Sequence, residues 1–169
     1  MAEEKASFEE VANYPVDPER MEQLFALQTE CAICWSTSDG WPIGVIHRFV
    51  WKDGKIWATC SGQRKRVPAL RRNPKSCVIV SSEGTKLGGD QTVTLKTTCR
   101  VHEDRETKDW FYPALARRLT RTPEQAEFMV KMFDTPRRVV LELTPVKLIS
   151  YDGTKLAAAV ARTQGRSIQ

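Results

Sequence analysis

Residues 42–60 read PIGVIHRFVWKDGKIWATC, and this stretch decides the fold class. Asp53-Gly54 separates two runs rich in β-branched and aromatic residues, which is the strongest short-range signal of a β-hairpin. Asp39-Gly40 gives a second turn signal before the first run. Both faces of that run are fairly apolar, and an antiparallel strand with two apolar faces indicates a closed or strongly curled sheet. We therefore expect an antiparallel three-strand meander over 29–37, 42–51 and 55–60.

The remaining chain adds strands that are joined mainly by tight turns. Such connections favour an antiparallel barrel over a doubly wound sheet, which needs long crossovers. Asp152-Gly153 is expected to form a third turn of the same kind, and Pro145 is expected to separate two strands. The pattern predicts about six strands and four helices, with further strands over 76–82, 92–101, 138–143 and 146–151, and helices over 17–27, 66–72, 106–119 and 122–133.

Helix boundaries are marked by capping residues. Asp17 suits an N-cap before Pro18, and Thr122 suits one before a capping box closed by Gln125. The 106–119 helix has one apolar face. Its predicted buried residues are Trp110, Phe111, Leu115 and Leu119.

The length of 169 residues predicts one domain. With 41% hydrophobic and 28% charged residues, the composition fits a globular protein and excludes collagen-like, disordered and small disulfide-stapled chains. We expect an acidic N-terminal arm over 1–16, a cofactor-binding barrel domain over 17–156 and a polar, alanine-rich tail over 157–169 that is compatible with partial disorder.

The net charge of +5 is distributed unevenly. The first 30 residues carry a net charge of about −6, and the remaining chain carries about +11. A basic body indicates an anionic partner: a phosphorylated cofactor, a nucleic acid or a membrane surface. The sequence has neither a signal peptide nor a run of the ~20 apolar residues that a membrane span needs, so we expect a cytoplasmic protein without a membrane partner.

The five cysteines do not indicate a disulfide framework, because their number is odd and no export signal accompanies them. Cys31-x-x-Cys34 matches a redox or zinc motif, but it lies in a predicted strand, where residues three apart face opposite sides. The two histidines, His47 and His102, are not at zinc-finger spacing. We therefore interpret the cysteines as small buried hydrophobic residues and expect no metal.

The segment that carries chemistry reads SGQRKRVPALRRNPK over 61–75, with six bases and no acids. Pro74 ends any helix before it, so a short helix is expected between Arg66 and Arg72. Its start follows directly on a strand, where free backbone N–H groups, the helix dipole and three cationic side chains would converge on a phosphate. A solvated basic helix and a nucleic-acid patch are the alternatives. The absence of aromatic residues in 61–75 disfavours the nucleic-acid interpretation.

The order of these segments resembles a known family. Pro42–His47, Trp57-Ala58-Thr59, Arg64-Lys65-Arg66 and Leu70-Arg71-Arg72-Asn73-Pro74 are similar to the split β-barrel flavin-binding superfamily, which includes pyridoxamine 5'-phosphate oxidases and deazaflavin (coenzyme F420)-dependent oxidoreductases. The late segment Leu143–Lys147 also resembles these proteins. The resemblance implies a mainly β, six-stranded antiparallel Greek-key barrel with peripheral helices. It also implies a homodimer that binds FMN or coenzyme F420 between its subunits.

The resemblance also implies site residues. It assigns the phosphate to Arg64, Lys65 and Arg66, with Gln63 beside them, and places Thr59 and Ser61 near the phosphate or ribityl chain. The ring system would lie along the second strand, flanked by the third, and the partner subunit would contribute Thr92 or Gln91. The ring-facing residues so implied are Val45, Ile46, His47, Arg48, Trp57 and Ala58.

The function implied is hydride transfer between the cofactor and a small organic substrate, with no catalytic side chain assigned. Tyr112 and Tyr151 are candidate proton donors, although buried tyrosines mostly pack and form local hydrogen bonds. His102 is expected to be solvated. The tail over 161–166 does not match the C-terminal arginine motif of the vitamin B6 oxidases, which disfavours that substrate. Non-enzymatic flavin or haem storage is the alternative, and a nucleic-acid partner is not expected.

Overall fold

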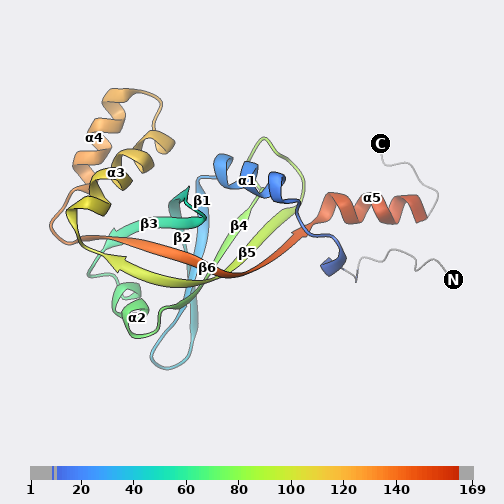
Figure 1. Ribbon diagram of the computed structural model, residues 1–169, viewed down its shortest axis with the longest axis horizontal. Helices are drawn as coiled ribbons and strands as arrows, with labels where there is room; N and C mark the ends of the chain where they lie inside the picture. The colour runs from blue at the N-terminus through green and yellow to red at the C-terminus, as the bar shows by residue number, and fades with distance from the viewer. Residues whose placement is uncertain (1–8, 10, 164–169) are drawn as a thin grey trace. The chain divides into compact units, whose positions relative to one another are not determined.

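The computed structural model describes Glu9 and residues 11–163. They form a closed six-stranded antiparallel barrel in the order β1-β2-β3-β6-β5-β4, with peripheral helices (Figure 1). This confirms the predicted fold class. The strands are β1 (Glu30–Ser36), β2 (Pro42–Lys52), β3 (Lys55–Ser61), β4 (Lys75–Ser81), β5 (Gln91–His102) and β6 (Arg138–Asp152); the helices are the 3-10 helix η1 (Val11–Asn13), α1 (Pro18–Leu27), α2 (Arg66–Arg72), α3 (Arg105–Leu119), α4 (Pro123–Phe133) and α5 (Gly153–Thr163).

The meander forms as its turn residues predict. β1 pairs with β2 from Glu30 opposite Arg48 to Ser36 opposite Pro42, and β2 pairs with β3 through Lys52 opposite Lys55. Asp53 and Gly54 have φ values of 53° and 71°. A two-residue hairpin turn with positive φ at both positions matches the strand twist, and the Asp-Gly pair is suited to it.

The barrel closes through pairs between strands that are distant in the sequence. β3 pairs with β6 from Ile56 opposite Leu143 to Ser61 opposite Arg138, and β1 pairs with β4, where Cys34 lies opposite Cys77. Side chains alternate along each strand, so β1 buries Cys31 and Ile33 and leaves Cys34 half-buried. All five cysteines are free thiols, and burial is the main cause that raises the pKa of the Cys31 thiol.

The chain divides into two compact units. One comprises residues 29–79 and 95–147 and contains the candidate site. The other comprises the described residues up to Gln28, together with 80–94 and 148–163. In this second unit Arg20 donates to the side chain of Gln91 at 3.0 Å and to the carbonyl of Leu87 at 2.8 Å.

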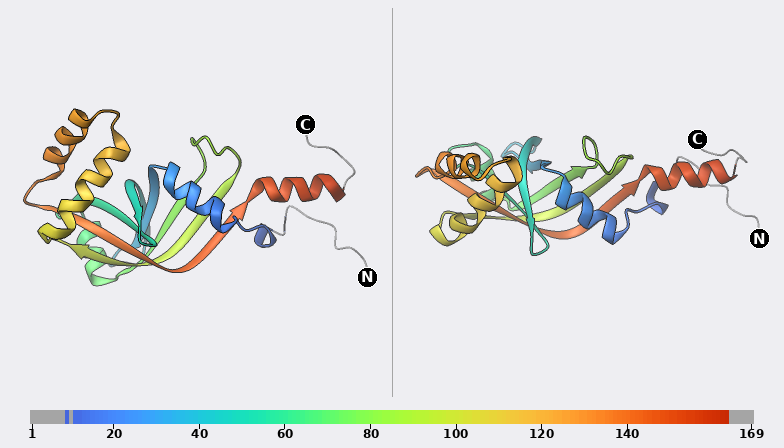
Figure 2. Two further views of the ribbon diagram at one scale, coloured as in Figure 1. Left: turned by 45° about the horizontal axis from the view of Figure 1, so that its top comes forward. Right: turned by 90° about the horizontal axis from the view of Figure 1, so that it is seen from above.

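Helices α3 and α4 lie side by side and cover one outer face of the meander (Figures 1 and 2). A buried cluster joins them to the sheet, with Trp57 against Trp110 in an edge-to-face contact of 4.9 Å. Of the predicted buried face, Phe111 and Leu115 are buried, whereas Trp110 and Leu119 are only partly buried. The cluster consists of Val50, Trp57, Phe111, Tyr112, Leu115 and Val140.

The end of the chain differs from the prediction in two places. β6 is one continuous strand through Pro145, so the predicted break was wrong. Pro145 lies beyond Leu143, the last β6 residue paired with β3, so its missing N–H costs no bond in that register. Asp152-Gly153 is not a hairpin turn either, because Asp152 accepts the N–H groups of Thr154 and Lys155 and begins α5.

Helix α5 includes residues 157–163, although the composition of this predicted tail is compatible with partial disorder. The rest of the predicted tail, 164–169, lies outside the described residues, as do residues 1–8 and 10 of the predicted N-terminal arm.

Two predicted caps also differ in detail. Asp17 makes no side-chain capping bond, because its carboxylate pairs with Lys155. Thr122 caps α4 as predicted, but the Gln125 amide oxygen accepts the N–H of Arg121 instead of closing the box. No described helix combines the length and apolarity of a membrane span.

Candidate cofactor site

The basic segment begins in a tight turn between β3 and α2. The Gly62 N–H donates to the carbonyl of Arg137 at 2.6 Å, and the Arg64 N–H donates back to Ser61 at 3.0 Å. A Cβ at Gly62 would meet the Arg137 carbonyl oxygen at 3.0 Å, so a larger residue would force the turn and the β6 backbone apart by a few tenths of an ångström. The turn is thereby fixed to the barrel wall, and the bases that follow are positioned by it.

The three bases predicted to bind phosphate separate into two environments. Arg64 and Lys65 are exposed. Arg66 is half-buried, where its NH1 group lies 2.8 Å from His47 Nε2 and its guanidinium lies over the Trp35 ring at 5.4 Å. Two of the three cations are therefore directly available to a ligand, and the third is held against the barrel.

His47 is the partner that orients Arg66. Burial, with a smaller contribution from the Arg66 charge, lowers the pKa of His47 to about 4, so the imidazole is neutral at pH 7. A guanidinium only donates, so Nε2 accepts from Arg66 and the proton resides on Nδ1, toward the Thr59 backbone. Both ring nitrogens of His47 are used within the protein.

Arg66 has one buried donor atom without a partner. Its Nε atom is buried and has no hydrogen-bond partner among the residues that the structure describes. A buried donor without a partner is costly, and a ligand oxygen would satisfy it. Burial raises the pKa of the neighbouring Cys60 thiol, and the Arg66 charge only partly opposes this effect. The donor set at this turn fits an anionic oxygen group.

The helix itself contributes less to anion binding than the sequence predicts. α2 is only seven residues long, and the N–H of Val67 already donates to the carbonyl of Arg64 at 2.9 Å. The Thr59 hydroxyl donates to the Val139 carbonyl at 2.7 Å, and the Ser61 hydroxyl accepts the Gln63 N–H at 3.4 Å. Recognition of a phosphate here would therefore rest mainly on the cationic side chains.

The predicted β2 residues face different ways. Ile46 is 66% exposed, Val45 is half-buried, and His47 points into the barrel. Arg48 is exposed, and its guanidinium is engaged by Glu30 at 2.8 Å and by the Thr29 hydroxyl. β2 thus presents apolar surface up to Ile46, whereas Arg48 presents a cation that is already paired within the protein.

Two of the predicted ring-flanking residues belong to the core. Ala58 is fully buried, and Trp57 is covered by Trp110 and His102, with its indole N–H donated to the Lys52 carbonyl. Neither presents a free face toward the turn, so we do not include them in the site. Thr92 is half-buried on the part of β5 that belongs to the other compact unit, and the neighbouring Gln91 is buried and bonded to Asp152.

A cavity of about 400 Å³ lies between the β1–β2 hairpin and α2. Trp35 lines it, and the sequence did not single this residue out; its place in the strand before a turn gave no signal. The cavity joins apolar side chains to the exposed cation of Lys65, which suits a ligand with an aromatic or aliphatic body and an anionic end. It is lined by Trp35, Thr37, Ser38, Ile43, Lys65, Ala69 and Arg72.

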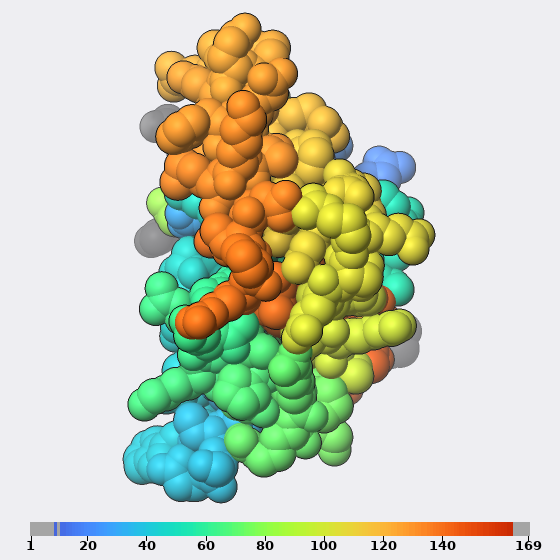
Figure 3. All heavy atoms as spheres, turned by 90° about the vertical axis from the view of Figure 1, so that its left-hand side faces the viewer, coloured from blue at the N-terminus to red at the C-terminus, as the bar shows by residue number. Residues whose placement is uncertain are grey.

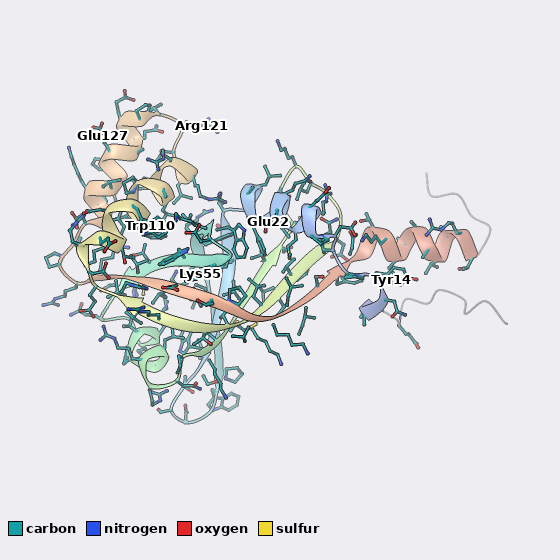
Figure 4. The ribbon with its side chains drawn as sticks, viewed as in Figure 1. Tyr14, Glu22, Lys55, Trp110, Arg121 and Glu127 are labelled. Atoms are coloured by element: carbon teal, nitrogen blue, oxygen red, sulfur yellow. The ribbon has the colours of Figure 1, made fainter. Side chains whose placement is uncertain are left out.

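His102 is not solvated, contrary to the prediction. Its Nε2 lies 2.7 Å from a Glu142 carboxylate oxygen, and the other oxygen of that carboxylate accepts from Lys55 at 2.6 Å. Burial raises the pKa of Glu142, but its bonds to Lys55 and His102 outweigh burial and lower it. Figure 4 shows Trp110 on α3 above Lys55 on β3. These residues hold α3 to the sheet and lie apart from the basic turn.

The tyrosines considered as proton donors lie outside this turn. Tyr112 is fully buried in the α3 cluster, where burial is the main cause that raises the pKa of its hydroxyl. Tyr151 is half-buried at the end of β6, in the other compact unit. No catalytic side chain is therefore assigned.

The model of the pyridoxamine 5'-phosphate oxidase family matches residues 18–151, which include the whole barrel apart from its last residue. The chain belongs to the pyridoxamine 5'-phosphate oxidase family. No curated protein matches it.

Solved structures show the same fold at low sequence identity. A conserved hypothetical protein from Mycobacterium tuberculosis is 17% identical with a TM-score of 0.73, over 94% of this chain and 93% of that one. An F420 reductase is 17% identical with a TM-score of 0.56, over 75% and 94%. HutZ, described as the haem storage protein from Vibrio cholerae, is 14% identical with a TM-score of 0.63, over 82% and 96%. This pyridoxamine 5'-phosphate oxidase family member therefore shares its barrel with proteins of differing function.

Proposed function

We propose that this protein is an oxidoreductase that binds FMN or coenzyme F420 and transfers a hydride between the cofactor and a small organic substrate. One observation carries the proposal. In a barrel of the pyridoxamine 5'-phosphate oxidase family, the exposed cations of Arg64 and Lys65 follow directly on β3, next to the buried, unpartnered Nε of Arg66. The donors at this turn are suited to the phosphate that both cofactors carry.

Each residue of the turn has a distinct part in this proposal. Arg64 and Lys65 bind the phosphate as exposed charges, whereas Arg66 offers its buried Nε in a fixed position because His47 and Trp35 hold its guanidinium. Gly62 keeps the turn against β6, so the three bases keep one geometry. When bound, the cofactor supplies the hydride chemistry, and the protein supplies binding, orientation and exclusion of water.

The ring of the cofactor would lie along the first half of β2, where both faces of the strand carry exposed apolar residues. Ile43 is exposed on one face and Ile46 on the other. Trp41 immediately precedes the strand, with 68% of its surface exposed. Isolated exposed hydrophobic residues are ordinary, but three within six consecutive residues form a surface that a partner would cover. We propose a second copy of this chain as that partner, so that the ring lies between the two subunits.

Storage of haem is the alternative function, since HutZ has the same fold. An axial histidine needs a free ring nitrogen. His47 uses its nitrogens toward Arg66 and the Thr59 backbone, and His102 uses its nitrogens toward Glu142 and Asp104. The engaged histidines favour a flavin-type cofactor.

A titration of the protein with FMN and with F420, side by side, tests the proposal. The protein is produced in a host that lacks F420, and binding is followed by quenching of cofactor fluorescence. Saturable binding of one cofactor, followed by its reduction or oxidation with a candidate substrate, is the expected result. Absence of binding by both cofactors would reject the proposal, and haem binding in their place would establish the alternative.

A further inference from the structure

A second cavity, which we call the basic cavity, lies on the other side of the β3–α2 turn. It has a volume of about 380 Å³ and is formed by four segments: the turn itself, the end of α2, the beginning of α3 with the residue before it, and the start of β6 with the residues that lead into it. Figure 3 shows this face, with the green residues of α2, the yellow residues of α3 and the orange residues before β6 meeting on it. Its charged lining residues are Arg71, Glu103, Lys108, Arg137 and Arg138.

The charges around this cavity do not balance. Arg71 is paired with Glu103, the one acidic residue in the lining. Lys108, Arg137 and Arg138 have no carboxylate partner among the described residues. Three cations that share one cavity repel one another, and the repulsion increases where water is partly excluded. An anion in the cavity would remove that repulsion.

Lys108 is the most informative of these residues. It is only 9% exposed, yet its ammonium group has no hydrogen-bond or ion-pair partner within Glu9 and 11–163. Lysine is almost never so buried without a partner, unless its charged end reaches water. The Lys108 ammonium keeps contact with water, and Lys108 lines the basic cavity.

Arg138 supplies a second unpartnered donor at the same place. Its Nε atom is buried without a hydrogen-bond partner in the described part of the chain, and its guanidinium lies over the Phe133 ring at 5.3 Å. The register between Ser61 and Arg138 fixes its backbone in the barrel wall. The cavity therefore combines the ammonium of a largely buried lysine and a buried guanidinium donor on rigid elements, which is the donor set that binds phosphate and carboxylate.

We propose that the basic cavity is a second anion-binding site, which takes a phosphate or carboxylate group of a small molecule. Lys108 and Arg138 hold the anion from inside, and Arg137 contributes an exposed charge at the rim. The volume is sufficient for a small anion such as phosphate or citrate. The proposal does not rest on the proposed cofactor, because Arg64 and Lys65 are not part of the cavity lining.

The test is isothermal titration calorimetry of the full chain with inorganic phosphate and with citrate, at constant ionic strength. We expect saturable binding of at least one of these probes. Lys108→Met and Arg138→Gln should each weaken it by about tenfold or more, the scale of a lost charged hydrogen bond. Lys131→Gln and Arg100→Gln remove the same charges at exposed positions outside the cavity and should change it by about twofold at most.

Several results would overturn the proposal. Binding of neither probe rejects it, and so does equal weakening by the cavity variants and the exposed controls, which indicates nonspecific attraction. If Arg64→Gln abolishes binding while Arg138→Gln leaves it unchanged, the anion lies on the turn of the proposed cofactor site instead. Circular dichroism identifies variants that do not fold. If Lys108→Met does not fold, the anion affinities of Arg137→Gln and Arg138→Gln test the site instead, and unchanged affinity in both would reject the proposal. Cofactor titrations of the same variants show whether loss of anion binding in the basic cavity occurs without loss of affinity at the proposed cofactor site.

Discussion

Arg64 and Arg66 are two positions apart in the sequence, yet the fold gives their side chains different tasks. Arg64 is exposed, whereas Arg66 is half-buried and held by His47 and the Trp35 ring. From the sequence alone, substitution of either arginine would be predicted to weaken cofactor binding equally and to leave stability unchanged. The structure changes this prediction for Arg66, because removal of its guanidinium leaves the buried His47 nitrogen without its donor.

Arg64→Ala should therefore weaken binding of the cofactor by about 1.5–3 kcal/mol while the melting temperature of the apoprotein stays unchanged. Arg66→Ala should weaken binding and also lower the melting temperature. Fluorescence titration and thermal unfolding of each variant measure the two effects, with Arg100→Ala as a control for a lost exposed arginine. Equal loss of stability in both variants would contradict the distinction.

His47 should make stability depend on pH. Its pKa is about 4 in the folded protein, against an ordinary value of 6.5. As the pH falls, His47 therefore takes up a proton in the unfolded chain before it does so in the folded protein. The contribution of His47 to the free energy of unfolding is complete above pH 6.5 and is lost progressively toward pH 4. The shift corresponds to roughly 3 kcal/mol.

His47→Gln isolates this contribution, since glutamine keeps an acceptor for Arg66 and does not titrate. Urea unfolding at pH 7 and at pH 4.5 should show a smaller loss of stability in the variant than in the wild-type protein. Identical losses in both proteins would show that His47 is not buried in its neutral form.

At the scale of elements, the β3–α2 turn depends on the close approach of Gly62 to β6. A methyl group there would meet the Arg137 carbonyl oxygen at 3.0 Å and the Val139 side chain at 3.4 Å. The turn and the strand would have to separate by a few tenths of an ångström. The bases that follow the turn would move with it.

Gly62→Ala should accordingly destabilise the protein by about 1–3 kcal/mol, the usual range for an overpacked site. It should also reduce cofactor affinity, although no ligand-binding group is removed. Chemical unfolding and cofactor titration measure the two effects. Gln63→Ala, at the exposed neighbouring position, is the control, and its stability should stay near that of the wild type; a matching loss there would show that the turn is generally sensitive.

At the scale of the whole molecule, the proposed homodimer depends on the apolar surface formed by Trp41 and the first half of β2. Trp41, Ile43 and Ile46 are 68%, 40% and 66% exposed in the single chain. Association would remove this surface from water and complete the ligand site between two subunits. Phe128 on α4 is equally exposed, at 65%, but does not lie on β2.

Ile46→Lys should convert the protein to a monomer, because it places a charge in the centre of the interface. Light scattering after gel filtration should give twice the chain mass of 19.2 kDa for the wild type and the single mass for the variant. Phe128→Lys should remain a dimer. A wild-type monomer, or dissociation by Phe128→Lys alone, would place the interface elsewhere or remove it.

Most of the barrel could be predicted from the sequence, because its signals are local. The Asp53-Gly54 turn needs positive φ at both positions, and these residues supply it wherever the hairpin lies in the fold. The starts of α1 and α4 follow from Pro18 and from Pro123 after Thr122. The basic segment over 61–75 was likewise evident, because charge density is a property of the chain itself.

The tertiary structure alone decided the direction of each side chain and the partners of the chain ends. Pro145 remains within β6 because the pairing with β3 ends before it, and Asp152 caps a helix instead of turning a hairpin because α5 follows. Arg66 points inward because β2 places His47 within its reach. Lys108 meets Arg138 in one cavity because barrel closure brings β6 beside β3. Local propensity fixes strands and turns, whereas these contacts join residues far apart in the chain and exist only after the barrel has closed.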